Sequence, residues 1–397
     1  MKRFTRPLSM LLALALILSV CACGKSPLKK STQSEKGISA ENMQIGVLLP
    51  DSAASGGQSY FHLLGIEKAM DTLKITKEPI LQKNITDVRF TQAEKLSVSE
   101  APETTEEPTT EKPTEPETFT DKDGNVFIHA VPIKPSKKPT ASEAMAELLD
   151  AGCNIFVAVD PIYDDFTAWV AAQYPDKYFL QYRGTHTELD NLQPYGDDLY
   201  EAFYLAGAAA AAAGAKNIGF VAGRRTELNR NYINAFALGA AKGSAEAKVT
   251  ARFTGTDFDL SLERTVPETL LKKDKCDGIA QSVYTALPQV TAADADNTLC
   301  IGFGYDMAAD GGEKNLCSVV YHFDVYFTEV LTALRDGTFT AKPYVGNTAN
   351  GMVGLSAIRS KDEKVQAKVT ALQKSLGEGN IQIRLPQKGY CKNVTVK

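Results

Sequence analysis

The sequence lacks the motifs on which most enzymes and metalloproteins depend. It contains neither a dinucleotide-binding Gly-x-Gly-x-x-Gly nor a phosphate-binding Gly-x-x-x-x-Gly-Lys-Ser/Thr, and the Gly-x-Ser-x-Gly elbow of hydrolases is missing too. The four histidines show no His-x-x-x-His spacing of the kind that zinc sites use. The acidic pair Asp164 and Asp165 is adjacent rather than facing, which does not suit the two carboxylates of a glycosidase. The sequence therefore predicts a protein that is not an enzyme and holds no metal or cofactor.

Cysteine is present but not in a framework. The sequence has 7 cysteines and no Cys-x-x-Cys pair, which argues against a zinc site. Two of them, Cys21 and Cys23, lie in the N-terminal segment. The remaining five are Cys153, Cys276, Cys300, Cys317 and Cys391. An odd number without regular spacing favours buried free thiols over a disulfide scaffold, with a single bridge as the alternative.

Acidic residues outnumber basic ones, 48 to 43. The formal net charge is -5, and no long basic stripe interrupts the sequence. Nucleic-acid binding needs such a stripe to neutralise phosphates, so a nucleic acid is not expected as a partner. The length of 397 residues accommodates a tether and one or two lobes with substantial cores.

The first 22 residues have the layout of an export signal. Three basic residues precede an apolar run over 8–20, which is too short to span a bilayer comfortably. Small residues flank the cysteines, and Ala22 immediately precedes Cys23. This site resembles a bacterial lipobox, which implies cleavage before Cys23, lipid attachment to its thiol and a location on the extracytoplasmic face of the cell membrane. A signal peptide cut elsewhere and an uncleaved anchor are the alternatives.

Two segments have the composition of linkers. The polar stretch 23–42 predicts a flexible tether above the membrane. A Thr/Pro/Glu tract over 97–120 cannot bury enough apolar surface to offset its ordering entropy, so we predict a disordered insertion. A strand-like run over 126–131 and a second Pro/Lys-rich piece over 132–139 follow it.

The rest of the chain alternates between short apolar runs and amphipathic helical patterns. Strands are expected over 44–49, 88–90, 154–159, 178–182, 217–221, 248–253, 278–282, 299–303 and 318–322. This rhythm is typical of α/β proteins whose parallel sheets are covered on both faces. The strands are too many for one sheet, so we predict two doubly wound lobes. Ligands bind beyond the carboxyl ends of such strands, which places the expected site in a cleft between the lobes.

An ordered set of short motifs resembles one family. The text Tyr-Glu-Ala-Phe-Tyr-Leu-Ala-Gly-Ala-Ala-Ala begins at Tyr200, Ile-Gly-Phe-Val-Ala-Gly ends at Gly223, and Tyr-Ile-Asn-Ala-Phe-Ala-Leu-Gly ends at Gly239. Together with Tyr-Pro-Asp-Lys-Tyr-Phe from Tyr174 and Ile-Gly-Phe-Gly-Tyr-Asp from Ile301, they are similar to the basic membrane protein (BMP) family of substrate-binding lipoproteins. Several members bind purine nucleosides for uptake by ABC transporters.

The resemblance implies the periplasmic-binding-protein type I fold, with two lobes joined by three crossings. The N-terminal lobe would hold residues 43–195 and 316–340, and the C-terminal lobe residues 196–315 and 341–397. Ligand binding would close the hinge. The protein, expected to be a monomer, would then present its small-molecule ligand to a membrane permease.

The same resemblance points to candidate ligand-binding residues. It places Asp165 opposite the base, Asp306 near ribose hydroxyls and Tyr232 in a stack on the base, with Asp160 as the local rival of Asp165. The loop after the first strand adds three more candidates, Gln58, Ser59 and Tyr60. The plainer alternatives are a helix N-cap or a turn for the aspartates and a core position for the tyrosine.

Several family positions carry different residues here. Gly304 stands where the family has its first ribose-region aspartate, Met307 where it has glutamine and Tyr321 where a lysine is usual. A site built for hydroxyls loses affinity without these polar partners. We therefore expect a solute-binding lipoprotein of an ABC importer with a nucleoside-like, small polar ligand. A surface-anchored sensor or interaction protein with the same fold is the alternative.

Overall fold

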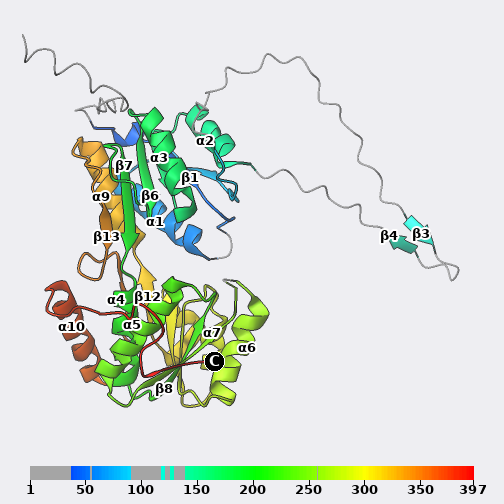
Figure 1. Ribbon diagram of the computed structural model, residues 1–397, viewed down its shortest axis with the longest axis vertical. Helices are drawn as coiled ribbons and strands as arrows, with labels where there is room; N and C mark the ends of the chain where they lie inside the picture. Colours follow the sequence, from blue (N-terminus) through cyan, green and yellow to red (C-terminus); the bar gives the residue numbers. More distant parts are fainter. Residues whose placement is uncertain (1–36, 54–55, 91–117, 121–125, 129–138, 257) are drawn as a thin grey trace, which may run out of the picture.

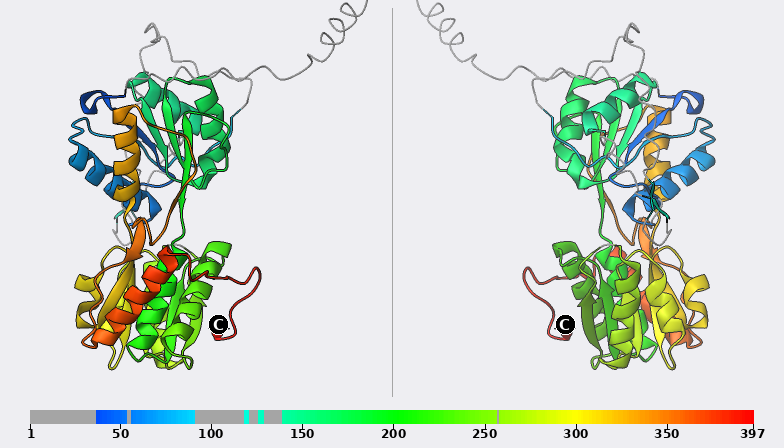
Figure 2. Two further views of the ribbon diagram at one scale, coloured as in Figure 1. Left: turned by 90° about the vertical axis from the view of Figure 1, so that its left-hand side faces the viewer. Right: turned by 90° about the vertical axis from the view of Figure 1, so that its right-hand side faces the viewer.

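Two parallel sheets, one in each lobe, organise the chain (Figure 1). The computed structural model describes residues 37–53, 56–90, 118–120, 126–128, 139–256 and 258–397. The expected signal peptide, Cys23 and most of the Thr/Pro/Glu tract lie outside the described residues. The lobes are stacked along the long axis and joined by a narrow waist, which both side views display (Figure 2). The predicted two-lobed α/β architecture is confirmed.

The N-terminal lobe contains a sheet of six parallel strands in the order β13-β7-β6-β5-β1-β2. Its strands are β1 (Ile45–Leu48), β2 (Ile80–Gln82), β5 (Ile155–Ala158), β6 (Tyr178–Tyr182), β7 (Leu192–Asp197) and β13 (Tyr344–Gly346). Its helices are α1 (Gln58–Leu73), α2 (Ala141–Asp150), α3 (Asp164–Gln173) and α9 (Phe323–Asp336), with short 3-10 turns η1 (Ala40–Asn42) and η2 (Pro161–Tyr163). Apolar side chains of α1 and α9 form the core on one face, and those of α2 and α3 form it on the other.

The C-terminal lobe contains seven strands in the order β14-β12-β11-β10-β8-β9-β15. They are β8 (Asn217–Ala222), β9 (Lys248–Phe253), β10 (Gly278–Gln281), β11 (Leu299–Gly304), β12 (Asn315–Tyr321), β14 (Val353–Leu355) and β15 (Val394–Val396). Only β14 runs antiparallel to its neighbour among these described strands. The helices are α4 (Tyr200–Ala212), α5 (Glu227–Gly243), α6 (Leu260–Lys272), α7 (Leu287–Ala293), α8 (Ala308–Gly311), η3 (Gly312–Lys314) and α10 (Glu363–Gly377). Separately, β3 (Thr118–Thr120) and β4 (Val126–Ile128) pair antiparallel.

Helices α4 and α5 pack unusually closely because small residues line their contact. A Cβ built on Gly207 would lie 2.0 Å from the Phe236 carbonyl oxygen, and one on Gly239 would lie 1.8 Å from that of Tyr204. Glycine at these two sites lets the helix backbones touch, with alanines filling the rest of the interface. The alanine-rich segment that contributed to the family resemblance therefore allows the close approach of α4 and α5.

Within the residues that the structure describes, the chain crosses between the lobes three times. The crossings run from β7 to α4, from β12 to α9 and from β13 to β14. By sheet membership, β12 belongs to the C-terminal lobe and β13 to the N-terminal lobe, which moves the expected boundaries at 316 and 341 to about the ends of these strands. Backbone pairing decides lobe membership, and an apolar run does not reveal its pairing partner.

Two local predictions differ from the structure. Residues 88–90 form no strand, and the edge strand beside β1 is β2 instead, in register through Val47 and Leu81. Residues 37–42 were expected to belong to the flexible tether, but they pack against the N-terminal lobe. The Ile38 N–H donates to the Leu334 carbonyl at 3.0 Å, and the Ile38 side chain packs on the core.

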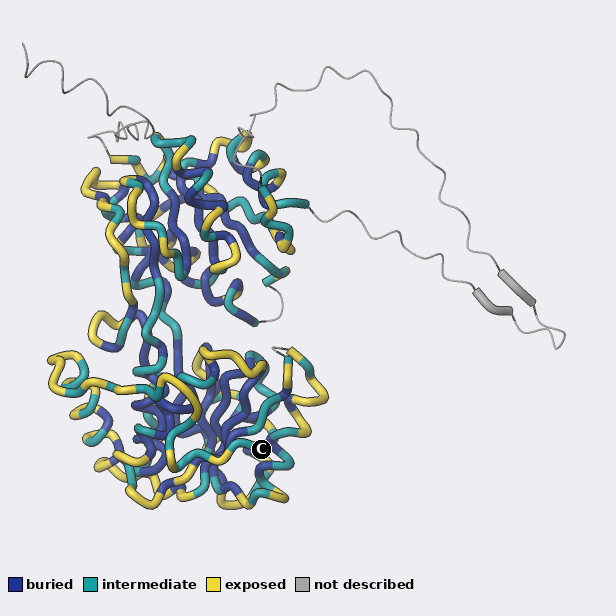
Figure 3. The backbone as a smooth tube through the Cα atoms, viewed as in Figure 1, coloured by how far each residue is buried: buried dark blue, intermediate teal, exposed yellow. Residues whose placement is uncertain are grey.

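Other expectations fit the structure. Cys153, Cys276, Cys300 and Cys317 are buried free thiols and Cys391 is a half-buried one, as predicted. Within the described ranges, none of the helices combines the length and the apolar character that a membrane crossing requires. Buried residues lie in the two sheets and in the helices packed on them, such as α4, and the exposed residues lie at the surface of each lobe (Figure 3).

Candidate functional site

Four charged residues follow the carboxyl ends of neighbouring N-lobe strands. Asp197 ends β7, Arg183 follows β6, Asp160 follows β5 by two residues and Asp51 follows β1 by three. Because these strands are parallel and adjacent, the four side chains form a row along the sheet edge that faces the C-terminal lobe. We call Asp197, Arg183, Asp160 and Asp51 the charged row.

Arg183 is held in a strained and half-buried position at the centre of this row. Its backbone has φ 51°, in the left-handed region that costs a non-glycine residue of order 1 kcal/mol. Its Nη2 lies 3.4 Å from Oδ2 of Asp197, whose side chain is fully buried. The Tyr182 hydroxyl and the Leu199 N–H also donate to the Asp197 carboxylate. Asp197 is thus fully engaged, while the guanidinium of Arg183 keeps further donors for a solute.

Asp160 caps a short turn and keeps acceptor capacity on its carboxylate. Its Oδ1 accepts the Ile162 N–H at 2.9 Å and so caps the short turn η2. Burial raises the pKa of the Asp160 carboxyl, the nearby Asp51 raises it further, and Arg183 opposes both. The remaining acceptor capacity of this carboxylate is suited to the N–H or O–H groups of a polar ligand. The expected N-cap alternative is therefore observed without excluding the binding role.

The facing C-lobe wall is aromatic. Tyr284 follows β10 and Tyr321 ends β12, and both pack against the cores of both lobes. The Tyr284 ring lies 5.6 Å from the Phe303 ring, and Tyr232 of α5 stacks on Phe203 at 4.6 Å. Aromatic faces of this kind provide stacking surfaces for planar or ring-shaped ligands.

Tyrosine hydroxyls of the C-terminal lobe interact electrostatically with Asp197 and Arg183 of the N-terminal lobe. Burial raises the pKa of the Tyr232 hydroxyl, Asp197 adds to this, and Arg183 opposes it. Tyr232 and Tyr321 in turn favour the charged form of Arg183, whose burial acts against its charge. Tyr232 is only 4 % exposed, so it forms part of the wall and its ring is largely used within the core.

The other expected ligand residues fall into two groups. Gln58, Ser59 and Tyr60 begin α1, and the buried Gln58 Nε2 and Ser59 Oγ have no hydrogen-bond partner among the described residues. Asp165 and Asp306 form ion pairs, and Asp306 also lines a pocket of about 360 Å³ between the lobes. The side chain of Asp165 is 85 % exposed and pairs with His186 at 2.9 Å, and Asp306 pairs with Arg359 at 2.5 Å. The charged row therefore brings together Asp160 and three residues that sequence reasoning missed.

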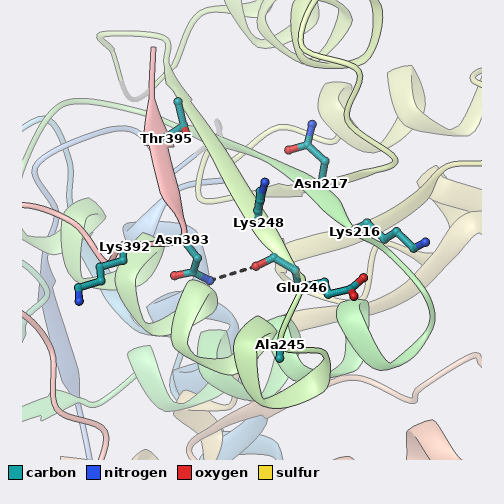
Figure 4. Close-up of a pocket in the computed structure, with 9 residues that line it drawn as sticks. Lys216, Asn217, Ala245, Glu246, Lys248, Lys392, Asn393 and Thr395 are labelled. Carbon is teal, nitrogen blue, oxygen red and sulfur yellow. Dashed lines mark hydrogen bonds between the residues drawn. The ribbon is translucent and has the colours of Figure 1, made fainter.

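A large cavity lies away from the charged row and the aromatic wall. It has a volume of about 860 Å³ and opens at the amino ends of β8, β9 and β15, lined by three lysines, Lys216, Lys248 and Lys392 (Figure 4). Asn393 Nδ2 donates to the Ala247 carbonyl at 3.3 Å along its wall. Ligands of open parallel sheets bind at the carboxyl ends, so we do not place the solute here.

Asp198, next to the charged row at the first crossing, provides a test of the local electrostatics. Burial, together with Glu201 and Asp197, raises the pKa of Asp198 to about 6. Between about pH 4 and 6 the folded protein therefore retains a proton that the unfolded chain has lost, so the free energy of unfolding falls as pH rises through this window.

We expect Asp198→Asn to raise the free energy of unfolding at pH 7.5 by about 1 kcal/mol, with allowance for solvent screening at a half-buried site. At pH 4 the variant and the wild type should be equally stable. Urea unfolding at both pH values measures this. The exposed Asp71→Asn serves as control, and a benefit of Asp198→Asn that is the same at both pH values would contradict the assignment.

Comparison with known proteins identifies the family. A sequence model described as "ABC transporter substrate-binding protein PnrA-like" matches residues 121–383. The chain belongs to this family, the Bmp family. The resemblance seen in the sequence is thus confirmed. The family is described as one of ABC transporter substrate-binding proteins.

A curated relative and several solved structures are also similar. A protein of Haloferax volcanii, named provisionally as an ABC transporter glucose-binding protein, is 31 % identical over 194 residues, which cover 49 % of this chain and 48 % of the relative. The chain thus spans about half the length of that relative. A solute-binding protein from Conexibacter woesei has a TM-score of 0.63 at 15 % identity and covers 86 % of this chain and 99 % of its own.

Another solute-binding protein, from Aeropyrum pernix, has a TM-score of 0.58 at 16 % identity, with 87 % and 94 % of the two chains covered. At these identities the structures support the fold alone.

Proposed function

We propose that this family member is a lipid-anchored solute receptor of an ABC importer. It captures a nucleoside-like, small polar solute in the cleft between its lobes and delivers it to a membrane permease. Lipid on Cys23 holds the protein, as a monomer, within reach of that permease, and the segment that follows Cys23 acts as its tether.

The charged row opposite the tyrosine wall is the observation that carries this proposal. Asp51 and Asp160 offer carboxylate oxygens, which accept hydrogen bonds from ring N–H groups and sugar hydroxyls. Arg183 offers donors between them and Asp197, and Tyr284 contributes an aromatic face on the other lobe. A nucleoside presents a planar base to stack and polar edges to bind, which matches both walls.

The name of the Haloferax relative makes sugars the natural comparison. A pyranose also carries hydroxyls for carboxylates and arginine, and its apolar face packs on aromatic rings. A ligand panel should therefore contain nucleosides, nucleobases and monosaccharides, glucose included.

Thermal unfolding in the presence of this panel tests the proposal. At about 100 times its Kd a ligand adds about 2.7 kcal/mol of stability, which corresponds to a rise in Tm of about 5–10 °C. We expect at least one nucleoside to produce such a shift. A response to glucose without any response to nucleosides or nucleobases would replace the nucleoside version with a sugar receptor. No response to any member would contradict the proposal.

A further inference from the structure

Phe61 of the N-terminal lobe is inserted into the C-terminal lobe. It lies in the first turn of α1, belongs to the N-lobe core and is only 4 % exposed. Its ring centroid lies 5.6 Å from that of Tyr321 and 6.2 Å from that of Tyr284. The third neighbour is the backbone of Gly304, where an added Cβ would lie 2.1 Å from Phe61 Cζ. Phe61 thus occupies a socket made by Gly304, Tyr284 and Tyr321.

Glycine is required in this socket for two separate reasons. Gly304 ends β11 with φ 91°, a conformation that side chains rarely adopt. A side chain there would also take the space of the Phe61 ring, as the Cβ distance shows. At Gly312, by contrast, only the backbone conformation favours glycine. Its φ is 55°, and no atom lies within 4 Å of a built Cβ.

The socket joins the cores of the two lobes, since Tyr284 and Tyr321 pack against both of them. Tyr284 also contacts the segment just before α1, since its ring lies 3.8 Å from a Cβ built on Gly57. Directly beyond the ring of Phe61, a pocket of about 360 Å³ separates the lobes again, lined among others by Lys68, His322 and Ser356. Phe61, Tyr284 and Tyr321 therefore form an aromatic bridge between the lobes at the edge of this pocket.

We propose that Phe61 is a positioning residue whose seat in the socket sets the path of lobe closure. The contact keeps the start of α1 at a fixed distance from the C-terminal lobe. The lobes can then rotate about this contact, and few other relative orientations are accessible to them. Such restriction before binding lowers the entropy that solute capture must overcome. The proposal does not depend on the identity of the solute.

The distribution of interlobe distances in the full chain without solute tests this proposal. A fluorophore pair is attached through azide-bearing residues that replace the exposed Lys83 and Glu227, one on each lobe near the cleft. Gly304→Ala should displace Phe61 and broaden the distribution about twofold, with a longer mean distance. Gly312→Ala also places alanine at a positive φ, but without a clash, and should leave the distribution unchanged.

Phe61→Ala separates the socket contact from backbone strain at Gly304. We expect Phe61→Ala to broaden the distribution by itself, and Gly304→Ala to add nothing further in that background. Urea unfolding of each variant verifies that both lobes remain folded. A wild-type distribution in Gly304→Ala, or an equal broadening by Gly304→Ala with and without Phe61, would overturn the proposal. Neither result would affect the proposed solute class.

Discussion

Asp160→Asn should weaken solute binding about 10- to 100-fold, which is the range for the loss of a hydrogen bond to a charged group. The amide retains the oxygen that accepts the Ile162 N–H, so η2 should keep its cap. The stability of the free protein should rise slightly at neutral pH, because burial and Asp51 make the ionised carboxylate costly in the folded state. A variant that becomes more stable and binds less well is the expected signature of a binding carboxylate.

Isothermal titration with the solute that gives the largest thermal shift measures the affinity. Asp165→Asn is the matched control, because Asp165 is nearby in the sequence but its exposed carboxylate pairs with His186 instead. The control should bind as the wild type does. Equal losses in both variants, or a loss only in Asp165→Asn, would contradict the role of the charged row.

Gly239→Ala should lower the free energy of unfolding by about 3 kcal/mol, at the upper end of overpacking costs. Intrinsic helix propensity alone predicts the opposite sign, since alanine is favoured over glycine by about 1 kcal/mol in a helix interior. The steric effect should win because the Cβ would lie 1.8 Å from a backbone oxygen, that of Tyr204, and no rotamer change relieves such a contact. Helix α5 would have to move away from α4.

Urea unfolding of the purified protein measures this change. Gly354→Ala in the same lobe is the control, because its built Cβ meets nothing within 4 Å and its φ is not positive, so its effect should stay within about 0.5 kcal/mol. If Gly239→Ala stabilised the protein, the close packing of α4 on α5 would be wrong.

The sequence was sufficient for the architecture because hydrophobic periodicity reports burial directly. The long apolar runs of β5 and β8 became central strands, buried throughout in β5 and in all but the first residue of β8. Strand β7 was missed because Leu-Gln-Pro-Tyr-Gly-Asp has neither alternation nor a continuous apolar run. Strand β13 has three residues and is defined by pairing with β7, which no local pattern shows.

The site was predicted in part for a similar reason. Asp160 follows a recognisable strand, so its place at the cleft could be expected, and the same pattern would have pointed to Asp51 and Arg183. Asp197 could not be found this way, because its strand was missed. Asp165 pairs with His186, and Asp306 pairs with Arg359. These partners are distant in the chain and come close only in the folded protein, so the sequence did not show the ion pairs.

Gly304 shows how a departure from the family pattern can be misread from sequence alone. In the sequence, Gly304 shows only that the family's aspartate is missing at this position. In the structure it makes room for Phe61, so the space over β11 is filled by the protein itself. We therefore propose that polar groups for the solute come from the charged row.

A crystal structure with the solute that gives the largest thermal shift tests the central claim most directly. The solute should lie between the lobes, with a polar atom within about 3 Å of the Asp160 carboxylate and a ring packed against the tyrosine wall. Solute bound instead in the lysine-lined cavity of the C-terminal lobe or in the pocket beyond Phe61, with the cleft empty, would contradict it.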